Sequence, residues 1–99
     1  MTEILLTVSA SELCLTESIT EEMILAAVES GVAEPVEGED LVNWVFDSTS
    51  VHWLKKAIRL HQDLEIDWVA VAMVIDLLQQ KESLQRENQY IRQQLKRFL

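Results

Sequence analysis

The sequence predicts a mainly α-helical fold: a winged helix-turn-helix domain with a small β-hairpin as its wing, followed by one long C-terminal helix. Two short helical patterns, separated by a tight turn and ended by a glycine, come first. A pair of short β-prone segments with a polar tip follows them. The last third of the chain shows a helical pattern with no breaking residue. The 99 residues include only two glycines and one proline, which favours long regular elements.

The first two helices have clear start and stop signals. A short β-prone run at 4–8 suggests a leading strand, and Ser9 then begins the capping box Ser-Ala-Ser-Glu, which predicts a helix at 10–17. Thr20 is the next expected N-cap, with two glutamates in the first turn, where the helix dipole favours acids. Gly31 lies where a helix commonly takes a left-handed C′ residue. Together these signals predict the helix-turn-helix.

The predicted wing consists of two extended segments, 32–36 and 42–46, on either side of the polar sequence GED. This pattern is typical of a hairpin with a loop of several residues. Asp47 then begins a third helix as its N-cap. Apolar residues one or two turns apart predict the inner face of that helix. This face consists of Val51, Leu54, Ala57, Ile58, His61 and Leu64.

Asp67 is the expected N-cap of a last helix that runs from Trp68 to the C-terminus, roughly 45 Å if it is helical throughout. Its first part, 68–78, is apolar nearly all round, so we expect it to be buried in the domain. From Gln79 it becomes polar, with a narrow stripe of apolar residues seven apart. That stripe consists of Leu77, Leu84, Ile91 and Phe98, and Lys81, Asn88 and Leu95 fall on the second position of the same seam.

This heptad stripe predicts a two-helix contact. We therefore expect a winged helix-turn-helix domain at 1–78 and a coiled-coil extension at 79–99. About three heptads are marginal alone, and so small a domain gains from a second stabilising contact. The sequence thus predicts a homodimer, with dimerisation residues Leu84, Asn88, Ile91, Leu95 and Phe98.

The charge of −9 is unevenly distributed along the chain. Residues 1–46 contain ten acids and no Lys or Arg, whereas residues 79–99 contain five bases and two acids. Affinity for nucleic acid depends mainly on contacts between cations and phosphates. The N-terminal half should therefore repel nucleic acid and attract a basic protein surface.

The sequence shows no sign of catalysis or of a bound group. No carboxylate belongs to a motif that would fix a base, a nucleophile and an oxyanion site, and there is no glycine-rich phosphate loop, so we expect neither an enzyme nor a cofactor. His52 and His61 are nine residues apart and lack companion ligands, so no metal site is expected. Cys14 lies in an apolar helix and is interpreted as a small hydrophobic residue. A lone cysteine, with no signal peptide and no apolar run long enough to span a bilayer, predicts a cytoplasmic protein.

The order of helix, helix, wing, helix and long helix resembles the MerR-type winged-helix regulators. The segments that carry this resemblance are ITEEMILAAVESGVAEP and WVFDSTSVHWLKKAIRLHQDLEIDWVAVAMVIDLL. More narrowly, WVFD, KKAIRLHQDLEIDW and LQRENQYIRQQLKRF resemble the chaperone modulator CbpM family. The resemblance covers about 8–98, with only a loose match in TVSASELC.

This resemblance implies a small non-enzymatic protein that binds the J-domain of a CbpA-type, DnaJ-like co-chaperone. Binding would block both the partner's stimulation of the Hsp70 chaperone DnaK and its binding to curved DNA. The resemblance also implies association with the nucleoid through that partner.

The acids of the N-terminal half fall where a MerR-type domain normally faces DNA, namely the exposed side of the second helix and the wing tip. A J-domain carries a basic helix followed by a His-Pro-Asp loop, which is complementary in charge. The predicted partner-binding residues are Glu21, Glu22, Leu25, Glu29, Glu37, Glu39, Asp40 and Trp44.

Several alternatives remain open at this stage. The acidic face could serve only solubility, Leu25 could pack beneath the wing, and Trp44 could join Phe46, Trp53 and Trp68 in the core. A MerR-like transcription regulator is the second functional interpretation, although it needs bases on the second helix and wing. A small-molecule sensor would need a cavity between the third and fourth helices. The C-terminal bases could line a coiled coil, pair with a second subunit's acids or touch nucleic acid weakly: they are Lys81, Arg86, Arg92, Lys96 and Arg97.

Overall fold

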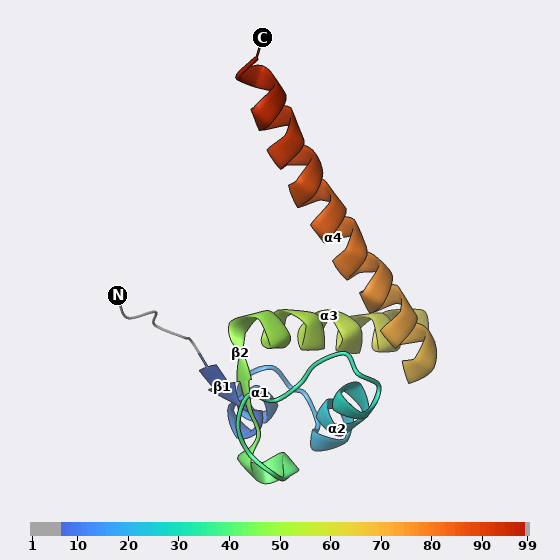
Figure 1. Ribbon diagram of the computed structural model, residues 1–99. Coiled ribbons are helices and arrows are strands. Elements are labelled where there is room, and N and C mark those ends of the chain that lie inside the picture. The colour runs from blue at the N-terminus through green and yellow to red at the C-terminus, as the bar shows by residue number, and fades with distance from the viewer. Residues whose placement is uncertain (1–6, 99) are drawn as a thin grey trace, which may run out of the picture.

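The computed structural model describes residues 7–98 and shows a small helical domain from which one long helix projects (Figure 1). The sheet has two strands, and a single turn of 3-10 helix, η1, interrupts the loop after the second helix. In chain order the elements are β1 (Thr7–Ser9), α1 (Ala10–Thr16), α2 (Glu21–Glu29), η1 (Leu41–Asn43), β2 (Val45–Asp47), α3 (Ser48–Leu64) and α4 (Trp68–Lys96). The predicted mainly α fold, with a small antiparallel sheet and a long C-terminal helix, is confirmed. The predicted leading strand at 4–8 lies partly outside the described residues.

Each of the four N-caps predicted from the sequence accepts a hydrogen bond from the backbone N–H three residues further on. Ser9 Oγ and Thr20 Oγ1 each lie 3.2 Å from their donors. The carboxylates of Asp47 and Asp67 each lie 2.8 Å from theirs. A cap of this kind typically stabilises a helix by about 1 kcal/mol. Local hydrogen bonding by short polar side chains therefore fixes where all four α-helices begin.

The end of α2 is a Schellman motif built around a glycine. Gly31 has a φ of +81°, its N–H donates to the carbonyl of Val28, and the N–H of Val32 donates to the carbonyl of Ala27, both at 3.0 Å. The two bonds satisfy carbonyls that the helix end would leave unpaired. The left-handed residue turns the chain sharply, so that it leaves α2 toward the wing loop, which consists of residues 32–44.

The strand pairing differs from the predicted wing. β2 pairs with β1, in the register Val8 with Phe46, and not with the segment 32–36. The end of that segment meets β2 only at an isolated bridge between Glu37 and Val45. The N–H of Val36 donates to the carbonyl of Val45 at 2.7 Å, and the N–H of Val45 donates to the carbonyl of Glu37 at 3.0 Å. The two-stranded wing expected from 32–36 and 42–46 is therefore wrong in its pairing, and a loop occupies the wing position.

The segment 42–46 begins in the 3-10 turn η1, where a strand was expected. Asp40 accepts from the backbone N–H of Asn43 at 3.1 Å and from its side-chain amide at 2.7 Å, which caps η1. Gly38 has a φ of +96°, and a Cβ there would lie 2.2 Å from the Asn43 carbonyl oxygen. The capped 3-10 turn is incompatible with a strand that begins at Val42, whereas the left-handed Gly38 lies in the polar tip GED, which was expected to be a loop.

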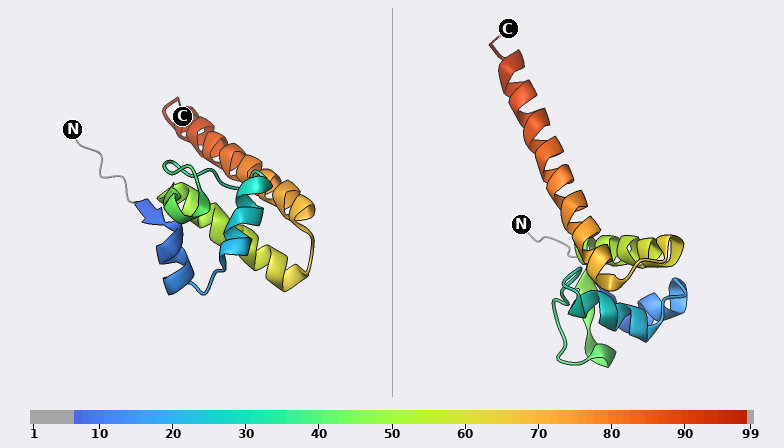
Figure 2. Two further views of the ribbon diagram at one scale, coloured as in Figure 1. Left: turned by 90° about the horizontal axis from the view of Figure 1, so that it is seen from below. Right: turned by 90° about the vertical axis from the view of Figure 1, so that its right-hand side faces the viewer.

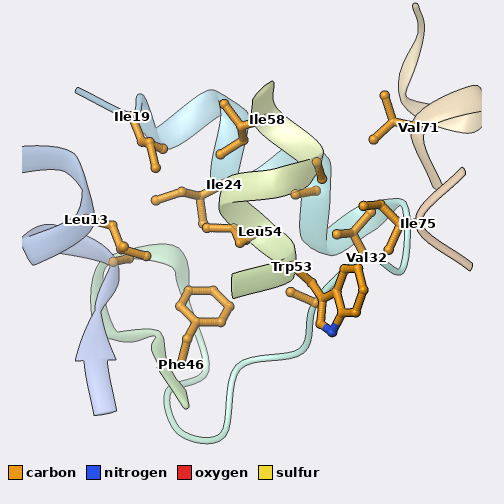
Figure 3. Packing of buried hydrophobic residues seen from close by; sticks show 14 residues of the cluster. Leu13, Ile19, Ile24, Val32, Phe46, Trp53, Leu54, Ile58, Val71 and Ile75 are labelled. Carbon is orange, nitrogen blue, oxygen red and sulfur yellow. The ribbon is translucent and has the colours of Figure 1, made fainter. Parts of the chain in front are cut away.

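The core forms where α1, α2 and the start of α4 pack around α3 (Figure 3). Phe46 projects from β2 into the cluster beside Leu13, and Trp53 lies at the side nearest α4, so both predictions of a core position are confirmed. Trp68 is half-buried at the edge of this cluster. The largest fully buried side chains are Phe46, Leu13, Ile24, Leu54, Ile75 and Val71.

Two predictions of burial are wrong. In the first turns of α4, Val71 and Ile75 are buried, but Val69, Met73 and Leu77 are 72%, 64% and 63% exposed. A helix that is apolar all round contacts the domain along one side only, and the described chain offers nothing to cover the other.

At the end of α3, Leu64 is 58% exposed and does not join the predicted inner face. The next residue, Glu65, has a φ of +53° and turns the chain away from the helix. The last turn of α3 therefore extends past the core it would have covered.

None of the helices in residues 7–98 combines the length and the apolar character that crossing a membrane requires.

Candidate functional site

The exposed side of α2 carries a group of acids around one leucine. Ile24 and Ala27 face the core and are fully buried, so the residues on the opposite side of the helix face outward. Leu25 is 38% exposed and lies outside the buried cluster, so it does not pack beneath the wing loop. Its neighbours one turn away on the same face are Glu21, Glu22 and Glu29.

These carboxylates are free to meet a ligand. Among residues 7–98, no Lys, Arg or His lies within 4.0 Å of any of them. The surface on α2 therefore combines three unpaired negative charges with an apolar side chain at their centre. A basic partner with a small apolar contact would complement both features.

The wing loop carries three further exposed acids. Glu37, Glu39 and Asp40 are all exposed, as predicted. The carboxylate of Asp40 has a structural role as well, since it caps η1 through Asn43. In Figures 1 and 2 both α2 and η1 lie on the side of the domain opposite the C-terminal end of α4.

Trp44 anchors the base of the loop. Its ring meets that of Phe46 edge to face, with centroids 6.3 Å apart, and its carbonyl accepts from the N–H of Ala10 at 2.9 Å. The side chain is half-buried and packs against the core. Trp44 therefore holds the loop to α1 while part of its ring remains available to a partner.

Three exposed apolar residues near these acids were not part of the predicted site. Val36 and Val42 belong to the wing loop, and Leu15 projects from α1 with 85% exposure. Leu15 follows the buried Leu13 by two positions, which on a helix places it on the opposite side. Helical spacing alone could have identified Leu15, but Val42 was hidden by its assignment to a strand.

Cys14 lies beside this surface as a neutral thiol. Partial burial raises the pKa of Cys14 above its ordinary value, and the negative charge of Glu21 raises it further. A raised pKa lowers the fraction of reactive thiolate. This agrees with its interpretation as a small hydrophobic residue. In the part of the chain that the structure describes, no three His, Cys, Asp or Glu side chains gather as a metal site requires.

A second unpartnered surface runs along α4. All five predicted dimerisation residues are exposed, and the apolar stripe begins earlier than expected, at Val69. With about 100° per residue, its members fall within about 80° of the helix circumference, opposite Val71 and Ile75. The apolar members are Val69, Met73, Leu77, Leu84, Ile91, Leu95 and Phe98. Asn88 is the polar residue at its edge.

The two surfaces approach each other at the root of α4. An open hollow of about 480 Å³ lies between the end of α2 and the first turns of α4. Val69, Ala72 and Met73 form its apolar wall, and Glu29 and Asp76 bring carboxylates to its rim. The hollow therefore joins the acidic face of α2 to the apolar stripe of α4.

Comparison with known proteins agrees with this geometry. Over residues 8–93 the chain matches the family described as MerR HTH family regulatory protein. It is 38% identical over 87 residues to the chaperone modulatory protein CbpM of Pseudomonas putida, which covers 88% of this chain and 85% of that protein. It is 35% identical over 99 residues to the protein of the same name from Citrobacter koseri, which covers 100% of this chain and 97% of that one. The chain therefore belongs to the MerR-type helix-turn-helix family of regulatory proteins and, within it, to the family of the chaperone modulatory protein CbpM.

Proposed function

We propose that this protein is a non-catalytic chaperone modulator that binds the J-domain of a CbpA-type, DnaJ-like co-chaperone through α2 and the wing loop. The observation that carries this proposal is the chemistry of that surface. It occupies the position that a MerR-type domain turns to DNA, yet it is acidic, exposed and free of Lys and Arg. The relatives' name, chaperone modulatory protein, supports a target in the chaperone system.

The mechanism that we propose is occlusion. The acidic surface covers the basic face of the J-domain, so that DnaK cannot dock there and the co-chaperone's DNA binding is also inhibited. The carboxylates of α2 and the loop steer the encounter and set the association rate. Leu25, Val36 and Val42 supply the apolar contacts that slow dissociation.

We further propose that two copies pair through the apolar stripe of α4. The stripe is exposed in a single chain over most of the length of the helix. A second copy would bury it, because that copy presents the same apolar stripe. Asn88 at the seam would fix the register. An antiparallel pair would place Arg92 and Lys96 of one helix near Glu29 and Asp76 at the root of the other, which favours that orientation over a parallel one.

The proposed site of action is the cytoplasm, with contact to the nucleoid made only through the co-chaperone. A MerR-like transcription regulator is the alternative, and the family match favours it in part. Direct DNA binding would need cations on α2 and the wing loop, and both have none. A duplex DNA titration at low salt would support the alternative if it showed saturable binding.

Charge-reversal variants test the proposed interface. Glu21→Lys/Glu22→Lys should weaken binding of an isolated CbpA-type J-domain by about tenfold or more, because attraction becomes repulsion at two exposed positions. The matched control is Asp63→Lys/Glu82→Lys, which changes the net charge equally at sites on α3 and α4. Equal affinity of both folded variants would show that α2 is not the interface.

A further inference from the structure

All bases between residues 7 and 78 lie on one helix. Lys55, Lys56 and Arg59 follow His52 on α3 at helical spacings of three, four and seven residues, which places the four side chains on one face. They line a shallow hollow of about 440 Å³ along the helix. The opposite side of α3 is buried in the core. This basic groove therefore faces away from the domain.

Most of the cations of the groove form no ion pair within the described residues. Lys55 Nζ lies 2.8 Å from Glu17 Oε1, in an ion pair whose two side chains are each about two-fifths exposed. In the described residues, Lys56 and Arg59 have no carboxylate oxygen within 4.0 Å. Lys56 instead lies 5.7 Å above the ring of Trp53. Two cations thus remain available, and the Glu17 contact shows that a carboxylate can approach this helix.

One edge of the groove is apolar. Leu60 is half-buried, and Leu64 is exposed one turn further along the same edge. At the N-terminal end of the groove, the rings of His52 and Trp53 pack edge to face with centroids 4.9 Å apart. A row of cations beside two leucines is complementary to a helix with a row of carboxylates beside an apolar row.

We propose that this groove is a second docking surface, and that its occupant is an acidic amphipathic segment of a partner protein. The carboxylates of the segment contact Lys56 and Arg59, and its apolar side chains cover Leu60 and Leu64. Nucleic acid is a poorer occupant, because the surrounding body carries ten acids in residues 1–46 and the chain has a net charge of −9. An acidic segment needs only a local match of charge, since Asp63 is the single acid that lines the groove.

This inference is independent of the proposed function. The groove is basic and lies on α3, whereas the proposed J-domain surface is acidic and lies on α2 and the wing loop. A partner that used both surfaces would need opposite charges in two places. The two proposals can therefore fail separately.

Fluorescence anisotropy tests the groove with a labelled amphipathic peptide of about 15 residues, or four helical turns, that carries Glu and Leu on adjacent faces. A matched peptide has Gln in place of every Glu. The full-length protein should bind the Glu peptide more tightly than the Gln peptide, and added salt should weaken the Glu peptide's binding. Equal binding of the two peptides, or no saturation with either, would overturn the proposal.

Variants then locate the site. Lys56→Glu/Arg59→Glu should bind the Glu peptide roughly tenfold more weakly, and Leu64→Ala should weaken binding of both peptides. The control Arg86→Glu/Arg97→Glu makes the same change of charge at two exposed positions on the side of α4 away from the apolar stripe, and should bind the Glu peptide like the unmodified protein. An equal loss of affinity for the Glu peptide in this control would show that the peptide responds only to the overall charge of the protein and not to the groove. Tighter binding of duplex DNA than of the Glu peptide would assign the groove to nucleic acid. Circular dichroism checks that every variant is folded.

Discussion

The imidazole ring of His61, near the end of α3, stacks on the indole ring of Trp68 at the start of α4, with ring centroids 4.5 Å apart and planes 20° from parallel. The Nδ1 atom of the same histidine lies 2.7 Å from the carbonyl oxygen of Ile66. A carbonyl can only accept, so the ring nitrogen donates this bond. One side chain thus contacts both the connecting segment and the first turn of the next helix.

Removing this stack should destabilise the domain. We expect Trp68→Ala to lower the free energy of unfolding by about 2–4 kcal/mol, because it removes a half-buried aromatic ring and its stacking partner. Urea denaturation followed by circular dichroism measures the change. Leu64→Ala, at an exposed position four residues earlier, should change the same quantity by less than about 0.5 kcal/mol. Equal changes in the free energy of unfolding for the two variants would mean that the stacking of His61 on Trp68 does not stabilise the domain.

The two glycines offer a comparison of backbone strain with steric overlap. A Cβ at Gly31 meets no atom within 4 Å, so Gly31→Ala should cost only the left-handed conformation, about 1 kcal/mol. Gly38→Ala carries the same strain and adds an overlap with the Asn43 carbonyl. We therefore expect the larger loss of stability, and a weaker affinity for the J-domain, in the Gly38 variant. Thermal unfolding that ranks the two variants in the opposite order would contradict this view of the wing loop.

Self-association should depend on the stripe of α4. Analytical ultracentrifugation of the full-length protein should show a dimer, with a melting temperature that rises with protein concentration. Leu84→Glu should shift the protein to a monomer, because it places a charge in the middle of the apolar seam. Gln85→Glu adds the same charge one residue later, away from the stripe, and should remain dimeric. A monomer in the unmodified protein at every concentration would refute the proposed pairing.

The reactivity of Cys14 reports on the start of α2. Burial and the charge of Glu21 raise the pKa of Cys14, so at mildly alkaline pH it should react with a thiol reagent more slowly than free cysteine does. The sign follows from the thiolate fraction, which falls as the pKa rises at fixed pH. Glu21→Lys replaces repulsion with attraction and should speed the reaction. Rates that are equal in the two proteins would place Glu21 too far from Cys14 to influence it.

Much of this fold follows from short-range patterns in the sequence. The four N-caps and the C′ glycine depend on residues within three or four positions of one another, and the structure confirms all five. Helical spacing also identified which side of α2 faces outward. These features were predictable because local hydrogen bonding and periodicity decide them.

The incorrect predictions have separate causes. Val42 is a β-prone residue, but the local cap that Asp40 forms with Asn43 places it in the 3-10 turn η1. Val69 and Met73 are apolar, as core residues usually are, yet both are exposed because the domain covers only one side of α4. The basic face of α3 was not predicted, because residues 47–78 as a whole contain five acids and only three Lys and Arg.

The proposed interface is tested most directly by calorimetric titration of the unmodified protein with an isolated CbpA-type J-domain, at low and at moderate salt. We predict saturable binding that weakens as salt rises, since the carboxylates of α2 and the wing loop attract the basic face of the J-domain. Absence of heat and of saturation at both salt concentrations, with the protein folded, would contradict the proposal that this acidic surface binds a J-domain.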